Sequence, residues 1–304
     1  MFAGTPDVAV PSLDALVASR HEVVGVVSRP DARRGRGKAL SPSPVAARAA
    51  ELGIPVLKPD HPRDPDFQAA LRELRPDCCP VVAYGALLPA AVLDIPTHGW
   101  INLHFSLLPD YRGAAPVQAA ILDGVAETGA VTFRIVPALD AGPVCGELRT
   151  AIGDRETAGD LLGRLAVAGA DLLVDTMDRI EEGTATFIEQ PAEGGSYAAK
   201  LEVADAHVDW SAPVDTLDRR IRACTPAPGA WTTLQGQKFR LHEVAPTDRP
   251  STDPGLVERE GRRVHVHTGT GQLELLRVQP AGKKAMDAAA WANGLQVDTV
   301  RLGS

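Results

Sequence analysis

The sequence predicts an α/β protein in which a mainly parallel sheet is followed by a small β-barrel. In the first 150 residues, apolar strand-like runs alternate with segments of helical periodicity, which is typical of a parallel sheet covered by helices. One long amphipathic segment then extends from Thr157 to Glu182. Beyond residue 205 the pattern changes to short alternating segments joined by turns, which favours a barrel.

The elements of the first domain follow in order from these patterns. The turn Ala3–Pro6 marks the exit from a first strand. Periodic apolar residues predict helices, which we place at 11–18, 45–52 and 67–74. Compact apolar runs predict buried strands between and after them, which we place at 23–27, 54–57, 79–83, 100–104 and 131–136.

The boundary between the domains is predicted from caps and breakers. Thr157 is a suitable N-cap for the long helix, and Gly183 follows its end. The next stretch has weak periodicity and several Gly and Pro residues, so it is interpreted as a linker. We therefore expect a first domain at 1–182, a linker at 183–205 and a barrel domain at 206–304. The barrel strands are placed at 238–244, 255–258, 263–267 and 273–278.

The composition is that of a globular protein without membrane spans. Hydrophobic residues make up 44% and charged residues 23% of 304 residues, enough for two domains with sizeable cores. No run of ~18 apolar residues is present, and the start lacks the pattern of a signal peptide. The four cysteines have neither metal-ligand spacing nor a disulfide pattern. These observations predict a cytoplasmic protein with reduced cysteines and no metal site.

The charge is unevenly distributed along the chain. The formal net charge is -8, but residues 206–304 carry 13 Lys and Arg against 11 Asp and Glu. The stretch Arg29–Lys38 holds five cations and one anion. Its Gly-Arg-Gly-Lys lacks the spacing of a Walker loop. Two interpretations of this stretch are equally supported, namely a solvated loop and a loop that contacts phosphates.

Asn102 and His104 form the strongest functional signal. They are two residues apart in a predicted strand, so their side chains project from the same face. Ligands of open parallel sheets bind at the carboxyl ends of strands, and this strand ends soon after His104. A lone histidine is usually a packing residue with a satisfied hydrogen bond. Asn, however, is depleted from strands, and the pair therefore indicates a site.

Asp140 is a third candidate. It follows the strand at 131–136 and lies in a turn that contains Gly142 and Pro143. Taken alone, it is best explained as a turn aspartate that bonds its own backbone. Beside a histidine and an asparagine, it becomes a candidate to orient and charge the imidazole or to accept a proton.

Two segments that contain these residues resemble the folate-dependent formyltransferase family. They are Ile101–Pro116 (INLHFSLLPDYRGAAP) and Leu139–Gly142 (LDAG). Further segments resemble the members of that family that act on an aminoacyl-tRNA, and they extend from one end of the chain to the other. These segments are 2–7, 35–38, 208–211, 222–231 and 279–285. Two departures are the short start before Phe2, which means either a clipped first strand or a misplaced start of the sequence, and Asp110, which stands where a basic residue is common.

The resemblance implies a Rossmann-like catalytic domain and an OB-like barrel domain that binds tRNA. It also implies 10-formyltetrahydrofolate as the formyl donor, the amino group of methionyl initiator tRNA as the acceptor, no metal, and a monomer. Asn102, His104 and Asp140 match the catalytic residues of the family. The folate site is expected at Ser106, Leu107, Leu108, Pro109, Tyr84 and Gly85. Contacts with tRNA are expected at Arg34, Arg36, Lys38, Lys283 and Lys284.

Three other functions agree with parts of the sequence. A formyltransferase acting on a sugar nucleotide or on glycinamide ribonucleotide would have the same catalytic segments, but the basic stretch and the cationic barrel argue against it. An RNA-binding protein without catalytic activity would give the Asn102 and His104 pair no role. A Rossmann dehydrogenase is disfavoured because no G-x-G-x-x-G follows the first strand.

Overall fold

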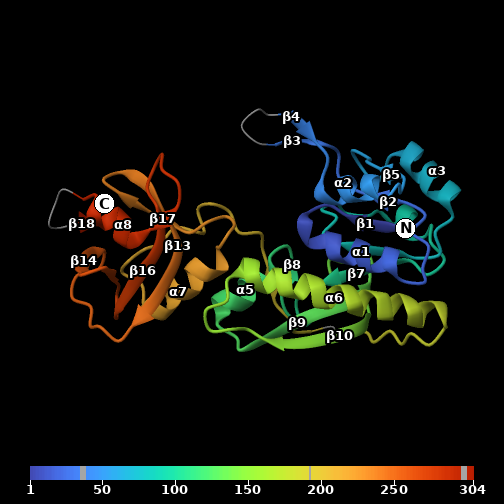
Figure 1. Ribbon diagram of the computed structural model, residues 1–304. Helices are drawn as coiled ribbons and strands as arrows, with labels where there is room; N and C mark the ends of the chain where they lie inside the picture. The colour runs from blue at the N-terminus through green and yellow to red at the C-terminus, as the bar shows by residue number, and fades with distance from the viewer. Residues whose placement is uncertain (35–38, 192, 296–299) are drawn as a thin grey trace. The chain divides into compact units, whose positions relative to one another are not determined.

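The computed structural model describes residues 1–34, 39–191, 193–295 and 300–304 (Figure 1). These residues fall into two compact units. The first unit comprises residues 1–116, 127–151 and 162–197, and the second comprises residues 117–126, 152–161 and 198–304. The predicted class, a mainly parallel α/β sheet together with a small antiparallel barrel, is confirmed.

The first unit is built on a seven-stranded sheet with the strand order β10-β9-β7-β6-β1-β2-β5. Five strands pair in parallel, whereas β9 is antiparallel to β7 and β10 is antiparallel to β9. The strands are β1 (Phe2–Gly4), β2 (Val26–Val27), β5 (Val56–Leu57), β6 (Cys79–Val82), β7 (Trp100–His104), β9 (Glu127–Arg134) and β10 (Val144–Ala151). Shorter strands outside this sheet are β3 (Ala32–Arg34), β4 (Ala39–Ser41), β8 (Arg112–Gly113) and β11 (Tyr197–Ala198).

The helices begin where the sequence supplies a cap or a proline. The side chain of Ser43 accepts a hydrogen bond from the backbone N–H of Ala46 at the start of α2 (3.0 Å), and Asp64 accepts one from Asp66 at the start of α3 (2.9 Å). Proline occupies the first turn of both helices, where no backbone N–H is needed. The helices up to residue 181 are η1 (Asp7–Ala9), α1 (Val10–Ala18), α2 (Pro44–Glu51), α3 (Pro65–Leu74), α4 (Ala90–Leu93), α5 (Pro116–Asp123) and α6 (Ala158–Glu181).

The long helix α6 has the buried face that its sequence predicts. Leu161, Leu165 and Leu173 are essentially fully buried, as expected for apolar residues at helical spacing. Within the first unit, the Thr176 hydroxyl lies 2.8 Å from that of Thr132 on β9. This buried pair satisfies two polar groups and fixes α6 against the sheet.

The boundaries of several strands differ from the sequence prediction. The strand expected at 23–27 is reduced to β2, and the one expected at 131–136 begins earlier, as β9. The strand β10 was not predicted. Its residues alternate between partly buried and exposed positions, because it lies at the edge of the sheet. It therefore lacks the continuous apolar run of the central strands.

The second unit is a nearly closed antiparallel barrel. Its strands follow the order β12-β13-β16-β15-β14-β18, with β17 paired to β16. Leu234, at the end of β12, forms a bridge with Leu302, so the two edges of the sheet meet. The elements are α7 (Val214–Ala223), β12 (Trp231–Leu234), β13 (Gln237–Thr247), β14 (Leu256–Glu260), β15 (Arg263–His267), β16 (Gln272–Gln279), β17 (Met286–Asp287), α8 (Ala288–Asn293) and β18 (Val300–Arg301).

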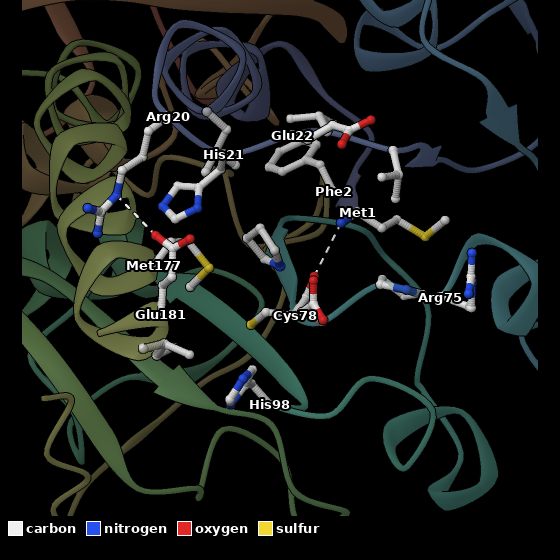
Figure 2. Close-up of a pocket in the computed structure, with 17 residues that line it drawn as sticks. Met1, Phe2, Arg20, His21, Glu22, Arg75, Cys78, His98, Met177 and Glu181 are labelled. Carbon is white, nitrogen blue, oxygen red and sulfur yellow. Dashed lines mark hydrogen bonds and ion pairs between the residues drawn. The ribbon is translucent and has the colours of Figure 1, made fainter. Parts of the chain in front are cut away.

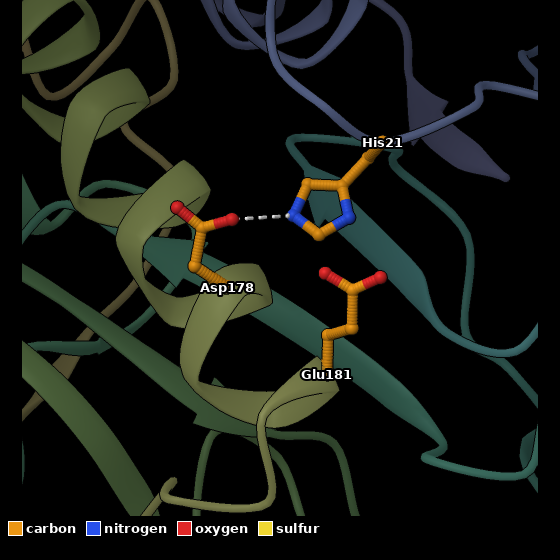
Figure 3. A group of neighbouring side chains, drawn as sticks. All are labelled: His21, Asp178 and Glu181. Carbon is orange, nitrogen blue, oxygen red and sulfur yellow. Dashed lines mark ion pairs between the residues drawn. The ribbon is translucent and has the colours of Figure 1, made fainter.

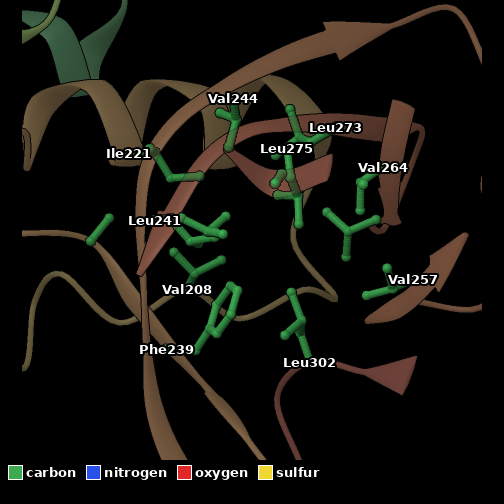
Figure 4. Close-up of a cluster of buried hydrophobic side chains, with 14 of the residues drawn as sticks. Val208, Ile221, Phe239, Leu241, Val244, Val257, Val264, Leu273, Leu275 and Leu302 are labelled. Atoms are coloured by element: carbon green, nitrogen blue, oxygen red, sulfur yellow. The ribbon is translucent and has the colours of Figure 1, made fainter. Parts of the chain in front are cut away.

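The barrel encloses a core of aliphatic and aromatic side chains (Figure 4). On β13, Phe239, Leu241 and Val244 are buried, so the spacing of two residues changes to three. The change occurs because the pairing of β13 with β16 shifts register between Leu241 and Val244. Such a bulge moves the following side chains to the other face, and it keeps Val244 in the core.

Phe239 is expected to be a major contributor to the stability of the barrel. Its side chain is 1% exposed and its ring centroid lies 4.8 Å from that of Trp291. We expect Phe239→Ala to lower the free energy of unfolding by about 3–5 kcal/mol, because it removes buried surface and leaves a cavity. Thermal unfolding followed by fluorescence would measure this. The exposed Val203 supplies the matched control, since Val203→Ala should leave the midpoint nearly unchanged.

Candidate active site

Asn102 and His104 lie on β7, between the parallel strand β6 and the antiparallel strand β9. Asn102 is paired with Val81 on one side and with Phe133 on the other. Asn102 is partly exposed, whereas the side chain of His104 is only 6% exposed. The two residues are separated by one position of a regular strand, so both project from the same face. An amide and an imidazole are therefore presented together at the end of a central strand.

The orientation of His104 is fixed by a backbone carbonyl. Its Nε2 lies 2.9 Å from the carbonyl oxygen of Tyr111, and a carbonyl can only accept a hydrogen bond. Nε2 therefore carries a proton, and in the neutral form of the ring Nδ1 is unprotonated. Tyr111 adopts a positive φ of 59°, and its backbone N–H donates to Oγ of Ser196 at 2.9 Å. A left-handed backbone conformation is energetically unfavourable for tyrosine. The hydrogen bond to Ser196 stabilises this conformation and so fixes the position of the Tyr111 carbonyl.

Asp140 lies beside the free nitrogen of the imidazole. Its Oδ2 is 3.9 Å from Nδ1 of His104, which is within ion-pair reach but beyond hydrogen-bond distance. The same oxygen accepts a hydrogen bond from the backbone N–H of Gly113 at 2.8 Å. Asp140 itself has a φ of 48°, a conformation that aspartate tolerates better than most residues.

The pKa of His104 is lowered from its ordinary value. Burial is the main cause, because it disfavours the charged imidazolium. The Asp140 carboxylate and the Tyr111 carbonyl act in the opposite direction, but they are the weaker effects. The ring is therefore neutral at neutral pH, with the proton on Nε2. The sequence led us to expect that Asp140 would favour a charged His104, and here the desolvation of the buried ring outweighs that carboxylate.

The turn expected to contact folate follows directly after β7. Ser106 is fully buried, and its hydroxyl donates to the carbonyl of Asp110 at 2.6 Å. Leu107, Leu108 and Pro109 are partly exposed in the same turn. This hydrogen bond joins the two ends of the turn. Leu107, Leu108 and Pro109, which lie between those ends, therefore remain partly exposed close to the catalytic candidates.

Tyr84 and Gly85 follow the end of the neighbouring strand β6. The Tyr84 side chain is buried, and burial raises the pKa of its hydroxyl. Gly85 has a φ of 82°, and no atom would lie within 4 Å of a Cβ placed there, so its backbone faces open space. These two residues therefore share the carboxyl edge of the sheet with the turn after β7.

The residues expected to contact tRNA lie in two other segments of the chain. Arg36 and Lys38 lie outside the described residues, and Arg34 is the last residue of β3. Lys283 and Lys284 are exposed in the turn between β16 and β17 of the second unit. The carbonyl of Lys283 accepts a hydrogen bond from Nε2 of Gln279 at 2.9 Å, which fixes the backbone of this turn.

A cavity of about 560 Å³ lies at the opposite, amino-terminal ends of the strands (Figure 2). The backbone amine of Met1 lies at its wall and donates to the carbonyl of Cys78 at 3.2 Å. Burial raises the pKa of the Cys78 thiol to about 11, so this cysteine is a poor nucleophile at neutral pH. Among the described residues, none of those predicted for the site lines this cavity.

His21, Asp178 and Glu181 form a cluster beside that cavity (Figure 3). Nε2 of His21 lies 3.1 Å from Oδ1 of Asp178. Nε of Arg20 lies 2.7 Å from Oδ1 of Asp178 and 3.1 Å from Oε2 of Glu181. Because the Arg20 guanidinium pairs with both carboxylates, and also with Glu182 at 2.8 Å, we assign this cluster to the attachment of the end of α1 to α6.

Three contacts of the site were not identified from the sequence. They are the backbone N–H of Gly113, the carbonyl of Tyr111 and the side chain of Gln190, which hydrogen-bonds to the carbonyl of Asp140 at 2.8 Å. Two of the three are backbone groups, whose direction depends on local torsion angles. Gln190 lies in the segment that the weak periodicity led us to interpret as a linker.

Comparison with known proteins identifies the family. Residues 1–177 match the formyl transferase family, and residues 200–296 match the formyl transferase C-terminal domain. The chain belongs to the formyl transferase family.

The family includes close relatives with a more specific name. A methionyl-tRNA formyltransferase from a Nocardioides species is 58% identical over 307 residues, covering 100% of this chain and 97% of the relative. The methionyl-tRNA formyltransferase of Streptomyces coelicolor is 57% identical over 299 residues, covering 98% of this chain and 96% of the relative.

A solved structure supports the fold. The N-formyltransferase from Helicobacter canadensis, in complex with folinic acid and dTDP-3-aminofucose, superposes with a TM-score of 0.69 at 18% identity. The superposition covers 92% of this chain and 98% of that one. At this identity the likeness concerns the fold and not the acceptor.

Proposed function

We propose that this chain transfers the formyl group of 10-formyltetrahydrofolate to the free amino group of methionyl initiator tRNA. The product is N-formylmethionyl-tRNA, which is used to initiate translation. The observation that carries the proposal is the 57–58% identity over practically the whole chain with relatives named methionyl-tRNA formyltransferase. The group formed by Asn102, His104 and Asp140 supplies chemistry that suits this reaction.

The attacking amine needs only modest activation. By analogy with a chain terminus, its ordinary pKa is ~8, so about a tenth is already neutral at pH 7. Attack on the formyl carbon places negative charge on the formyl oxygen. We assign the Asn102 amide as a donor to this oxyanion. Loss of one such donor raises the barrier by roughly 3–4 kcal/mol in other enzymes.

We assign proton transfer to His104 and Asp140 together. A neutral imidazole with its proton on Nε2 has a lone pair on Nδ1, and that nitrogen lies 3.9 Å from the Asp140 carboxylate. A proton released by the amine can pass to this pair, and the carboxylate then stabilises the imidazolium that forms. The same proton is available for the folate nitrogen that departs, so the pair ends the cycle in its initial state.

The folate donor is assigned to the carboxyl edge of the sheet. Its proposed contacts are Ser106, Leu107, Leu108 and Pro109 in the turn after β7, with Tyr84 and Gly85 after β6. The buried Ser106 bond supports this assignment because it gives the turn a fixed shape. The backbone at Gly85 supports it as well, since no atom lies within 4 Å of the position that a Cβ would take there.

The tRNA is assigned to cationic segments. These are the basic loop with Arg34, Arg36 and Lys38, and the barrel turn with Lys283 and Lys284. We propose a catalytic domain at 1–182, a linker at 183–205 and a tRNA-binding domain at 206–304. We further propose that the protein acts as a monomer in the cytoplasm. Among the described residues, no helix is long and apolar enough to cross a membrane.

The acceptor is tested by offering formyl-labelled 10-formyltetrahydrofolate with two acceptors in parallel. One is methionyl initiator tRNA and the other is an amino-sugar nucleotide. We expect label in the tRNA fraction alone. Transfer to the sugar nucleotide, with none to the tRNA, would assign the chain to a different branch of the family.

We expect Arg36→Ala to weaken the use of tRNA. Loss of one phosphate contact should raise KM for tRNA and reduce the slope of log KM against log salt by about 1. Steady-state kinetics at several salt concentrations would measure both. The exposed Arg63 gives a matched control, Arg63→Ala. If the salt slopes of the two variants equal that of the unmodified protein, the basic stretch is a solvated loop.

A further inference from the structure

The segment after α6 is hydrogen-bonded to two of the segments that form the candidate active site. Ile188 forms an antiparallel bridge with Val144, in which each backbone N–H lies 2.8 Å from the other carbonyl. Further along, Ser196 bonds to the backbone of Tyr111 and Arg112, both at 2.9 Å. The chain expected to be a free linker thus contacts both the turn before Val144 and the turn after β7.

Gln190 lies between these two attachments, and all four hydrogen-bonding positions of its amide are used. Nε2 donates to the carbonyls of Asp140 at 2.8 Å and Gly142 at 2.7 Å. Oε1 accepts from Arg112, with Nε at 3.1 Å and Nη2 at 2.7 Å. The two carbonyls require a donor and the guanidinium requires an acceptor, so the orientation of the amide is determined by its partners.

These bonds complete a ring around Asp140. The carboxylate of Asp140 accepts from Gly113, Gly113 follows Arg112 in the chain, Arg112 binds Gln190, and Gln190 binds the carbonyl of Asp140. The turn has little freedom to compensate for loss of this ring. A Cβ on Gly142 would lie 1.8 Å from the carbonyl oxygen of Arg134, and Asp140 has a positive φ.

We propose that Gln190 is a positioning residue that holds Asp140 at its place beside Nδ1 of His104. Gln190 acts through the main chain of Asp140 and does not contact the substrates. The proposal rests on the proposed function insofar as Asp140 takes part in formyl transfer. Displacement of a catalytic group by about 1 Å can lower a rate by roughly 100-fold, so a clamp on this turn has a direct effect on catalysis.

Two substitutions separate positioning from simple packing. Gln190→Ala removes all four bonds. Gln190→Glu keeps the size of the side chain and an acceptor for Arg112, but it replaces the donor group with an oxygen that faces two carbonyls. A residue that merely fixes Arg112 would tolerate glutamate. The exposed neighbour supplies the matched control, Glu189→Gln, which changes the same functional groups on a side chain that faces solvent.

The kinetic test measures kcat, and KM for donor and acceptor, at a temperature well below thermal unfolding. We expect both Gln190 variants to lose about 10- to 100-fold in kcat, with KM values within about twofold of the unmodified protein and with Glu189→Gln unaffected. Unchanged kcat in Gln190→Glu, or an effect confined to KM, would overturn the proposal. If Gln190→Ala does not fold, the isosteric glutamate variant still decides it.

A second measurement does not depend on the acceptor. The groups that act on His104 are the Asp140 carboxylate and the Tyr111 carbonyl, together with burial. Glutamate would add a charge that itself raises the pKa of His104, so this measurement uses Gln190→Ala. If loss of the amide releases Asp140, the titration midpoint of His104, followed by NMR without substrates, should move to lower pH. An unchanged midpoint in Gln190→Ala would overturn the inference. Absence of formyl transfer by the unmodified protein would instead contradict the proposed function alone.

Discussion

Substitution of His104 by alanine is expected to lower kcat by about 10²- to 10⁴-fold, the range typical of a general acid–base group. The ring is buried and neutral, with one nitrogen on the Tyr111 carbonyl and the other beside Asp140. Alanine can neither accept the proton of the amine nor, as an imidazolium would, donate it to the departing folate nitrogen. Single-turnover formylation of methionyl-tRNA would measure the loss without interference from product release.

Binding should be much less affected than turnover. We expect Kd for donor and acceptor to stay within a few-fold, because the imidazole is covered and its role is confined to the reacting atoms. The matched control is His98→Ala, which removes an exposed histidine shortly before β7. A His104→Ala variant that retains a tenth or more of the single-turnover rate would remove His104 from the mechanism.

Asp140→Asn is expected to have the second-largest effect. Asparagine can still accept the hydrogen bond from Gly113 with its amide oxygen, so the turn should keep its shape. The negative charge beside Nδ1 is lost, however, and the imidazolium formed during turnover is no longer stabilised. We expect kcat to fall by about 10²- to 10⁴-fold. Thermal unfolding, compared with that of the exposed-site variant Asp94→Asn, would show whether the fold is intact.

The pH profile of the Asp140 variant has a defined direction. His104 must be neutral to accept a proton, so activity is lost as pH falls through its pKa. Burial sets that pKa below the ordinary value, while Asp140 raises it. Removal of the charge should therefore move the acid limb of log kcat to lower pH. A shift to higher pH would contradict the assignment of the two residues as a pair.

The central residues of the candidate site could be predicted from the sequence because strand geometry is regular. The spacing of Asn102 and His104 places both side chains on the same face of the strand. In a parallel sheet, ligands bind at the carboxyl ends of the strands, and this pair lies at such an end. Asp140 lies far along the chain, in a turn with no periodicity. Taken alone it was best explained as a turn aspartate, and it became a candidate only beside Asn102 and His104; the resemblance to a family then supplied a reaction.

The supporting contacts were not accessible for a different reason. Gln190 lies among Gly and Pro residues, where weak periodicity indicates an irregular segment but not its attachment. The Tyr111 carbonyl and the Gly113 N–H are backbone groups, and every residue except proline has both whatever its side chain. Only the local torsion angles direct these two toward the site, and the sequence pattern does not predict those angles. The protonation of His104 depends on burial as much as on its neighbour, and the pattern of residues does not report burial quantitatively.

The central claim is that the resting site holds a neutral His104 with its proton on Nε2 and Nδ1 free beside Asp140. Nitrogen NMR of ¹⁵N-histidine-labelled protein, with His104→Ala used to assign the signal, tests this directly. The account predicts a protonated Nε2 and an unprotonated Nδ1 at pH 7, with a titration midpoint below ~6.5. A midpoint above that value, or a proton on Nδ1 of the neutral ring, would contradict it.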